Sequence, residues 1–400
     1  MAHPAGTPGE VFLVALRLGL TSFGGPIAHL GYYERTYVRN LRWLSSEHYS
    51  GLISLCQLLP GPTSSQVGFL VGLHRAGWLG ALAAWIGFTF PSALAMYAFA
   101  LWTPADPGPR MQAVLHGLML TAVVVVAQAV WSMGRTLCPD WKRRLIATAA
   151  CLLLLFQHSG AAQLAALTGG GIAGGLLCGS LRRCAPDLPL QPDHRAAWLA
   201  LIIFIVLLIG LPIFAVFDPR GPVALASLFY RSGAFVFGGG HVVLPLLRQA
   251  LVPPGWMPDT RFLAGYGFAQ AVPGPLFTFA AYLGAVTAPL HDSLLWSLLA
   301  LVAIFLPGLL LAITGLSLFG RLARSGAANA ILAGVNGAVV GLLAAALYDP
   351  VWTGAVHSVV DVPIVLCAFL LLQRYKMPPI FIAGFCIIAV FSLPGRHFAM

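Results

Sequence analysis

The chain has 400 residues, of which 59% are hydrophobic and only 8% are charged. Soluble domains carry about 25% Asp, Glu, Lys and Arg, so this composition excludes a soluble enzyme, a nucleic-acid-binding protein and a disordered scaffold. The formal net charge of +10 agrees with basic residues spread through the short loops of a membrane protein. The seven cysteines form no CxxC motif, and we expect them to be packing residues, with no metal and no cofactor. The composition predicts an all-α polytopic membrane protein whose partner is the lipid bilayer.

About thirteen apolar stretches are candidates for membrane crossings, which need about 20 residues as a helix. Several are short or interrupted, and in chain order they are 11–30, 51–73, 77–101, 110–132, 142–157, 161–180, 196–217, 224–245, 262–287, 292–318, 327–347, 352–372 and 378–394. The longest polar loop, 181–195, indicates a boundary between two halves. We divide the chain into a first transporter repeat at 1–180, a linker with an extra segment at 181–217, and a second repeat at 218–400.

The basic residues predict the orientation of the chain, since Lys and Arg are enriched in cytoplasmic loops. If each stretch crosses once from a cytoplasmic N-terminus, fourteen basic loop residues fall inside and six fall outside. The C-terminus is then periplasmic. Arg35, Arg39 and Arg42 fall outside in this count and oppose the assignment.

The two halves share a sequence repeat. RLGLTSFGG at 17–25 matches RSGAFVFGG at 231–239, and QLLPGP at 57–62 matches QAVPGP at 270–275. Pro91 matches Pro307, and the nearly constant offset of 213 to 216 residues indicates a duplication. Six crossings in each half plus one extra segment would place the halves in opposite orientations, as in many secondary transporters. We therefore expect two inverted-topology repeats.

Helix breakers occupy matching positions in both halves: Phe-Gly-Gly at 23–25 and 237–239, and Pro-Gly-Pro at 60–62 and 273–275. Non-helical backbone at membrane depth is tolerated where it is buried in protein or lines a wet cavity. Each break begins a half-helix whose first N–H groups lack partners and carry partial positive charge. Four such ends meeting near the midplane predict an anion site. The alternative is that the glycines only permit close helix packing.

Arg17 and Arg231 each lie six residues before their Phe-Gly-Gly, inside apolar sequence, and Glu10 is placed to neutralise Arg17. Two arginines suit a doubly charged oxyanion, although they are also consistent with residues that extend to the membrane interface. The predicted substrate-binding residues are Arg17, Ser22, Phe23, Gly24, Gly25, Pro26, Gln57, Pro60, Gly61, Pro62, Thr63, Ser64, Arg231, Phe237, Gly238, Gly239, Gly240, His241, Gln270, Pro273, Gly274 and Pro275.

Other polar residues leave two interpretations open. Gln57 and Gln270 match across the halves, and they can bind an oxygen of the substrate or join two helices. His29 and His241 follow the breaks without aligning, which favours structural roles. Asp349 and Asp361 are either proton carriers or solvated caps at segment ends.

These motifs resemble the chromate ion transporter family in its long form with two homologous halves. The resemblance covers nearly the whole chain and rests on FGGP at 23–26, WLS at 43–45, QLLPGP at 57–62, FGGGH at 237–241, WMP at 256–258 and the second PGP. It implies a bacterial inner-membrane protein with antiparallel halves that exports chromate, has sulfate as a close analogue and gives chromate resistance. Leu276 and Phe277 replace the hydroxyls that follow the first PGP, so the halves are expected to contribute unequally.

A secondary transporter for a tetrahedral oxyanion is the favoured function, and an anion channel or a sulfate transporter is the alternative. A membrane enzyme is disfavoured, because HExxH, GxSxG and paired intramembrane carboxylates are absent. An interior-negative potential favours export of a dianion, with proton exchange, and hence an antiporter, as an optional addition. The oligomeric state stays open between a monomer and a homodimer.

Overall fold

The structure is a computed structural model that describes residues 6–23, 25–104, 108–157, 159–179, 188, 190, 194–237, 242–289 and 291–392. Within these residues all regular structure is helical, which confirms the all-α class. Five helices are long and apolar enough to cross a membrane: Thr63–Trp102, Pro109–Leu137, His194–Ala215, Ser293–Ser317 and the run Gly326–Ala355. The chain is therefore a multi-pass membrane protein.

The first half begins with short helices and continues with long ones. They are α1 (Pro8–Thr21), α2 (Gly25–Tyr33), the π-helix η1 (Glu34–Asn40), α3 (Ser46–Leu58), α4 (Thr63–Trp102), α5 (Pro109–Leu137), α6 (Trp141–Phe156) and α7 (Gly160–Leu177). A bend at Ala76 and Gly77 divides α4, where Gly77 adopts a φ of +65° that glycine reaches without strain from a Cβ. The bend agrees with the two separate stretches predicted at 51–73 and 77–101.

The extra helix α8 (His194–Ala215) precedes the second half and leaves most of its apolar side chains exposed. The second half then repeats the pattern of the first. Its helices are α9 (Pro222–Ala234), α10 (Val243–Leu251), α11 (Asp259–Ala271), η3 (Leu276–Thr278), α12 (Phe279–Thr287), α13 (Ser293–Arg324), α14 (Gly326–Ala346), η4 (Leu347–Trp352), α15 (Thr353–Ala355), α16 (Asp361–Arg374) and α17 (Pro379–Phe391).

Two of the predicted stretches are pairs of short helices rather than single crossings. The stretch 11–30 divides into α1 and α2, and 224–245 divides into α9 and α10. A helix of 14 residues such as α1 is about 21 Å long, which is less than the roughly 30 Å of a bilayer core. These helices are therefore too short to cross a membrane individually.

Arg75 shows that the short helices of the first half return to the side from which they start. Its guanidinium bonds the Glu10 carboxylate at 3.1 Å, near the start of α1. It also lies 5.0 Å over the ring of Trp43, just after η1. The start of α1, the residues that follow η1 and the bend of α4 thus lie together. The expectation that Arg35, Arg39 and Arg42 lie across the membrane from the start of α1 is therefore wrong.

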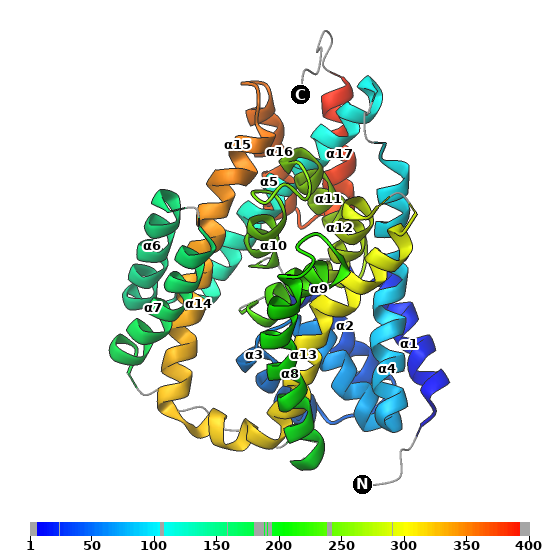
Figure 1. The fold of residues 1–400 in the computed structure, drawn as a ribbon, viewed down its shortest axis with the longest axis vertical. Helices are drawn as coiled ribbons and strands as arrows, with labels where there is room; N and C mark the ends of the chain where they lie inside the picture. Colours follow the sequence, from blue (N-terminus) through cyan, green and yellow to red (C-terminus); the bar gives the residue numbers. More distant parts are fainter. Residues whose placement is uncertain are drawn as a thin grey trace.

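One long helix of each half packs against two helices of the other half. In the first half, α6 and α7 pack against α14, which belongs to the second half. In return, α16 and α17 pack against α5. Figure 1 shows these two groups at different sides of the molecule, with the start of α1 and the end of α17 at opposite ends of the long axis. Each half therefore covers a helix of the other.

One contact between the halves has no counterpart. The helix α11 packs along α5, where Gly267 lies so close that a Cβ would be 1.9 Å from the carbonyl oxygen of Leu118. The corresponding pair in the repeat, α3 and α14, is not in such contact. The halves are thus similar in order but differ in this packing contact.

Candidate functional site

The four predicted breaks meet in two pairs, each made of one break from each half. The N–H of Gly61, in the first Pro-Gly-Pro, donates to the carbonyl oxygen of Val236 at 2.7 Å, directly before Phe237. The N–H of Gly274, in the second Pro-Gly-Pro, donates to the carbonyl oxygen of Ser22 at 3.0 Å, directly before Phe23. The two hydrogen bonds join equivalent positions of the repeat in opposite directions.

Glycine is required at the centre of both Pro-Gly-Pro turns. Gly61 has a φ of +122° and Gly274 a φ of +109°, in the region that side chains rarely adopt. A Cβ on Gly61 would lie 2.8 Å from Cα of Gly308, and one on Gly274 would lie 2.6 Å from Oγ of Ser92. Each turn thus packs against the long helix of the other half, next to the matched prolines of α4 and α13.

Gln66 stabilises the contact between the first Pro-Gly-Pro turn and α13. Its Nε2 donates to the carbonyl oxygens of Pro60 and Gly308, both at 2.9 Å, and the side chain is fully buried. Its Oε1 has no hydrogen-bond partner among the described residues. Gln66 was not among the predicted site residues, although an amide side chain inside an apolar helix, one turn after a break, is a signal that the sequence contains.

The start of α4 presents hydroxyls in a buried setting. Helix α4 begins at Thr63, and Oγ of Ser64 lies 3.3 Å from Nδ1 of His29 on α2. The buried hydroxyls of Ser22 and Ser65 have no partner within the described part of the chain. In the second half, the hydroxyl of Thr278 donates to the carbonyl oxygen of Pro275, within its own turn. The halves differ here as the sequence predicts.

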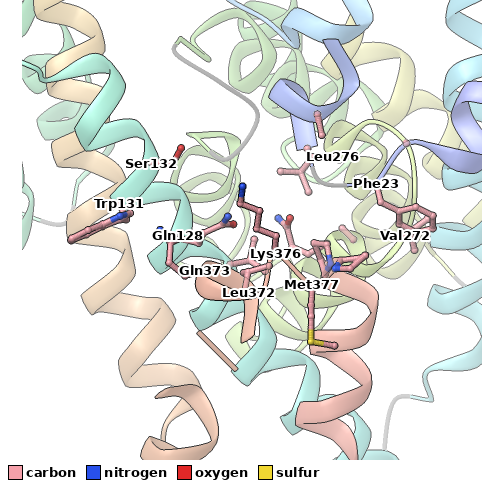
Figure 2. A pocket seen from close by; sticks show the side chains of 18 of the residues that line it. Phe23, Gln128, Trp131, Ser132, Val272, Leu276, Leu372, Gln373, Lys376 and Met377 are labelled. Carbon is pink, nitrogen blue, oxygen red and sulfur yellow. The ribbon is translucent and has the colours of Figure 1, made fainter. Parts of the chain in front are cut away.

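A cavity of about 610 Å³ adjoins the pair formed by the first Phe-Gly-Gly and the second Pro-Gly-Pro. Residues from the breaks form one wall, and α5 with the turn between α16 and α17 forms the other (Figure 2). The lining includes Phe23, Gly25, Gln270, Gly274 and Leu276 on the first wall, and Gln128, Trp131, Ser132, Arg135, Gln373 and Lys376 on the second.

Two cationic side chains belong to this cavity. The Arg135 guanidinium lies 4.6 Å from the centre of the Trp131 ring, and Lys376 extends between α5 and the turn before α17 (Figure 2). Both are exposed, so they lie at the rim. Deeper in, Nε2 of Gln270 is buried and has no acceptor in the described structure. The cavity thus offers two positive charges and an N–H donor.

The predicted arginines lie elsewhere. Arg17 and Arg231 are exposed and neither lines the cavity. The proposed neutralisation of Arg17 by Glu10 is wrong, because the Glu10 carboxylate bonds Arg75. Each arginine lies six residues before its Phe-Gly-Gly motif, and the two therefore lie on matching helices, α1 and α9. This spacing does not determine which face of each helix meets the cavity.

The remaining predicted residues are exposed, pack against the core, form the two turns, or lie outside the residues that the structure describes. Gln57 is exposed and does not line the cavity, unlike its match Gln270. Phe237 packs against the core, and Pro26 follows the first residue of α2. Pro60, Pro62, Pro273 and Pro275 form the two turns. Gly24, Gly238, Gly239, Gly240 and His241 lie outside the described residues.

Comparison with known proteins identifies the family of the chain. The chain matches the chromate transporter family at residues 9–176 and again at 223–391. The chain belongs to the chromate transporter family. Two separate matches agree with the long form that has two homologous halves. No solved structure matches the chain.

Three relatives illustrate the range of the family. The chain is 27% identical to the chromate transport protein of Pseudomonas aeruginosa over 85% of this chain and 80% of that protein. It is 26% identical to the chromate transport protein of Cupriavidus metallidurans over 98% of this chain and 95% of that protein. An uncharacterized transporter of Bacillus subtilis, 26% identical, matches 40% of this chain but 94% of its own length. This last relative is about half the size of the chain.

Proposed function

We propose that this protein is a secondary transporter that exports chromate, a divalent tetrahedral oxyanion, across the bacterial inner membrane and so confers chromate resistance. The observation that carries the proposal is the cavity in which Arg135, Lys376 and Gln270 surround one pair of helix breaks. Membership of the chromate transporter family supports chromate as the substrate. Positively charged side chains and N–H donors around a helix break suit an oxyanion, whereas a cation site would need carboxylates.

The proposed arrangement is a pair of inverted-topology repeats, at 1–180 and 218–400, joined by the linker and α8. The reciprocal bonds of Gly61 and Gly274 support it, because they relate equivalent breaks in opposite directions. The partner exchange of α5 and α14 supports it as well. With a cytoplasmic start of α1, the return of η1 to that side places Arg35, Arg39 and Arg42 inside, in keeping with the positive-inside rule.

The substrate would sit between the breaks and α5. Phe23, Gly25, Gln270 and Gly274 would shape its inner surface, and Arg135 with Lys376 would attract it at the rim. In the proposed topology the C-terminal end of α5 faces the cytoplasm. Loading from the cytoplasm is what an exporter requires.

The membrane potential is the proposed driving force. It acts with about 2.3 kcal/mol per elementary charge per 100 mV, so a dianion leaving the cell gains about 4.6 kcal/mol. This corresponds to roughly three decades of concentration ratio at about 1.4 kcal/mol per decade. Export therefore runs downhill electrically, and uptake would need several cations.

Everted membrane vesicles test the function directly. Vesicles that contain the protein should accumulate labelled chromate when an interior-positive potential is imposed, and excess sulfate should compete. Collapse of the potential and of the proton gradient should abolish accumulation. Accumulation that persists without either gradient or a counter-anion would refute the mechanism.

An anion channel with the same site is the second candidate, because the cavity rim is open. Counterflow separates the two: a carrier preloaded with unlabelled chromate accelerates entry of labelled chromate, whereas a channel does not. The same assay with sulfate inside determines whether sulfate is a transported substrate.

A further inference from the structure

A buried pair of ionisable side chains joins the two halves away from the cavity. Nε2 of His116 on α5 lies 3.1 Å from Oδ1 of Asp361 at the start of α16. The side chains are 3% and 0% exposed. Burial of two such groups costs free energy unless their charges and hydrogen bonds are matched, and ionisable groups inside a membrane protein are candidates for function.

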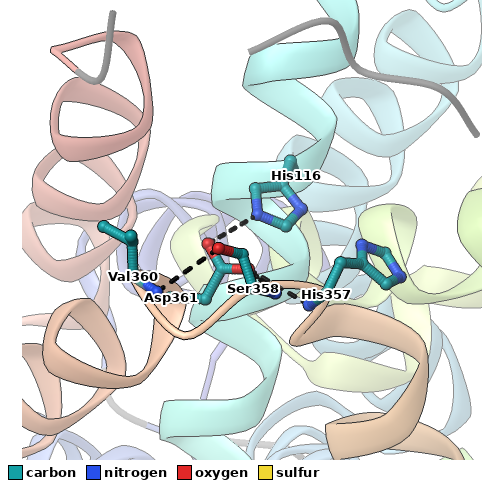
Figure 3. A network of polar contacts seen from close by, with 5 residues as sticks. All are labelled: His116, His357, Ser358, Val360 and Asp361. Carbon is teal, nitrogen blue, oxygen red and sulfur yellow. Dashed lines mark hydrogen bonds and ion pairs between the residues drawn. The ribbon is translucent and has the colours of Figure 1, made fainter. Parts of the chain in front are cut away.

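Backbone N–H groups hold the carboxylate of Asp361 in place. Its Oδ2 accepts hydrogen bonds from the N–H groups of His357 and Ser358, at 3.1 and 3.0 Å (Figure 3). Two N–H donors favour the ionised carboxylate. Because a carboxylate only accepts, Nε2 of His116 must carry a hydrogen. The pair is thus a carboxylate held by two backbone N–H groups and facing an imidazole, a group that binds or releases a proton near neutral pH.

The pair lies on the same two helices that line the cavity further along their length. Gln128 on α5 and Gln373 on α16 line the cavity, and each lies twelve residues after its member of the pair. Twelve helical residues span about 18 Å. A displacement of α16 along α5 would therefore both reshape the cavity wall and separate His116 from Asp361.

We propose that His116 is a proton-binding site that couples proton movement to transport of the oxyanion, with Asp361 as its fixed counter-charge. In the arrangement described, Asp361 stabilises the protonated imidazole. When α16 moves relative to α5, a buried imidazolium loses its counter-charge and releases the proton. This inference rests on the proposed transport function and adds the coupling ion to it.

The other titratable groups near the pair either have contacts of their own or are exposed. The ring of His357 lies 5.6 Å from that of His116 and is solvent-exposed. On the helices and turns packed against α5 and α16, Cys386 contacts Thr121, Arg261 donates to Pro104, Asp259 bonds Arg248, Asp349 accepts from Thr353, Tyr266 packs against Phe279, and Tyr348 is exposed. His116 is therefore the buried imidazole that faces Asp361.

Proteoliposomes with a pH-sensitive dye inside test the proposal. At a potential clamped to zero, and at alkaline pH where chromate is the dianion, an imposed chromate gradient should drive proton flux through the wild type. His116→Gln keeps an N–H donor for Asp361 but binds no proton, so it should lose this flux and retain chromate counterflow. Asp361→Asn should lose it as well.

His357→Gln is the matched control, because it removes a neighbouring imidazole and keeps the N–H that bonds Asp361. It should move protons as the wild type does. Proton flux in His116→Gln equal to that of the wild type would overturn the proposal. So would a wild type that exchanges chromate without moving protons, a result that leaves the transport function standing. A wild type without chromate counterflow would overturn both.

Discussion

The N–H of Gly61 donates to the carbonyl oxygen of Val236 and thereby attaches the Pro-Gly-Pro turn of one half to the residue before the Phe-Gly-Gly of the other. Gly274 and Ser22 repeat the bond in the reverse direction. Both turns are backbone structures without space for a side chain. Their sequence requirement is therefore steric, and it extends to the helices that cross them.

We expect Gly61→Ala and Gly274→Ala each to destabilise the folded protein. An unfavourable φ costs about 1–3 kcal/mol, and the added methyl group would also contact Gly308 or Ser92. Thermal unfolding of the detergent-solubilised protein measures the loss. Gly384→Ala, on α17 with nothing within 4 Å, is the control and should unfold as the wild type does. Equal stability of all variants would contradict the turn geometry.

Arg135→Gln is expected to weaken chromate binding. Loss of one charge-assisted hydrogen bond of about 1.5 kcal/mol would raise the KM for chromate roughly tenfold, and Arg135→Lys should recover part of it. Arg17→Ala and Arg231→Ala, outside the cavity, should change KM less. Initial rates of chromate entry into everted vesicles provide the comparison. A larger defect in Arg17→Ala than in Arg135→Gln would place the site elsewhere.

Gln66→Leu should lower stability more than its position inside an apolar helix suggests. It leaves the carbonyl groups of Pro60 and Gly308 without the donor they share, and an unsatisfied buried polar group costs about 1–3 kcal/mol. The unfolding temperature reports this cost. Gln57→Leu removes the same amide from an exposed position and should leave the unfolding temperature unchanged.

The proposed topology predicts which loops face the cytoplasm. Reporter fusions at Gly108 and Met400 should give periplasmic signals, and a fusion at Gln191 should give a cytoplasmic one. The short helices before the bend of α4 do not alter this result, because they return to their starting side. A cytoplasmic signal at Met400 would refute the inverted arrangement.

The sequence predicted the helix breaks and the match between those of the two halves, because glycine and proline directly determine the local backbone conformation. It did not predict that each Pro-Gly-Pro pairs with the Phe-Gly-Gly of the opposite half, since a repeat offset relates equivalent residues and not contacting ones. Arg135 and Gln66 lie on regular helices without matching residues in the other half. Asp361 was recognised as either a proton carrier or a cap, but its partner His116 is 245 residues away.

The spacing of the arginines did not predict which residues line the cavity, and the reason is physical. Arg17 and Arg231 occupy equivalent positions, but a helix of one and a half to two turns beyond them can turn either face to the cavity. The charge that reaches the cavity comes from α5 and from the turn after α16. Both are distant in sequence from the breaks that form the other wall, and only tertiary packing brings them together.

The exchange of partners between α5 and α14 has a consequence for how the protein is made. A chain that ended after α7 would have no α16 and α17 to cover its α5, and its own α6 and α7 would have no α14 to pack against. Such a half chain would need a second copy before either copy could complete these contacts, and in the proposed topology that copy would be inserted in the opposite direction. In this chain both halves are present in a fixed one-to-one ratio, and in the proposed topology α8 is the additional crossing that reverses the second half.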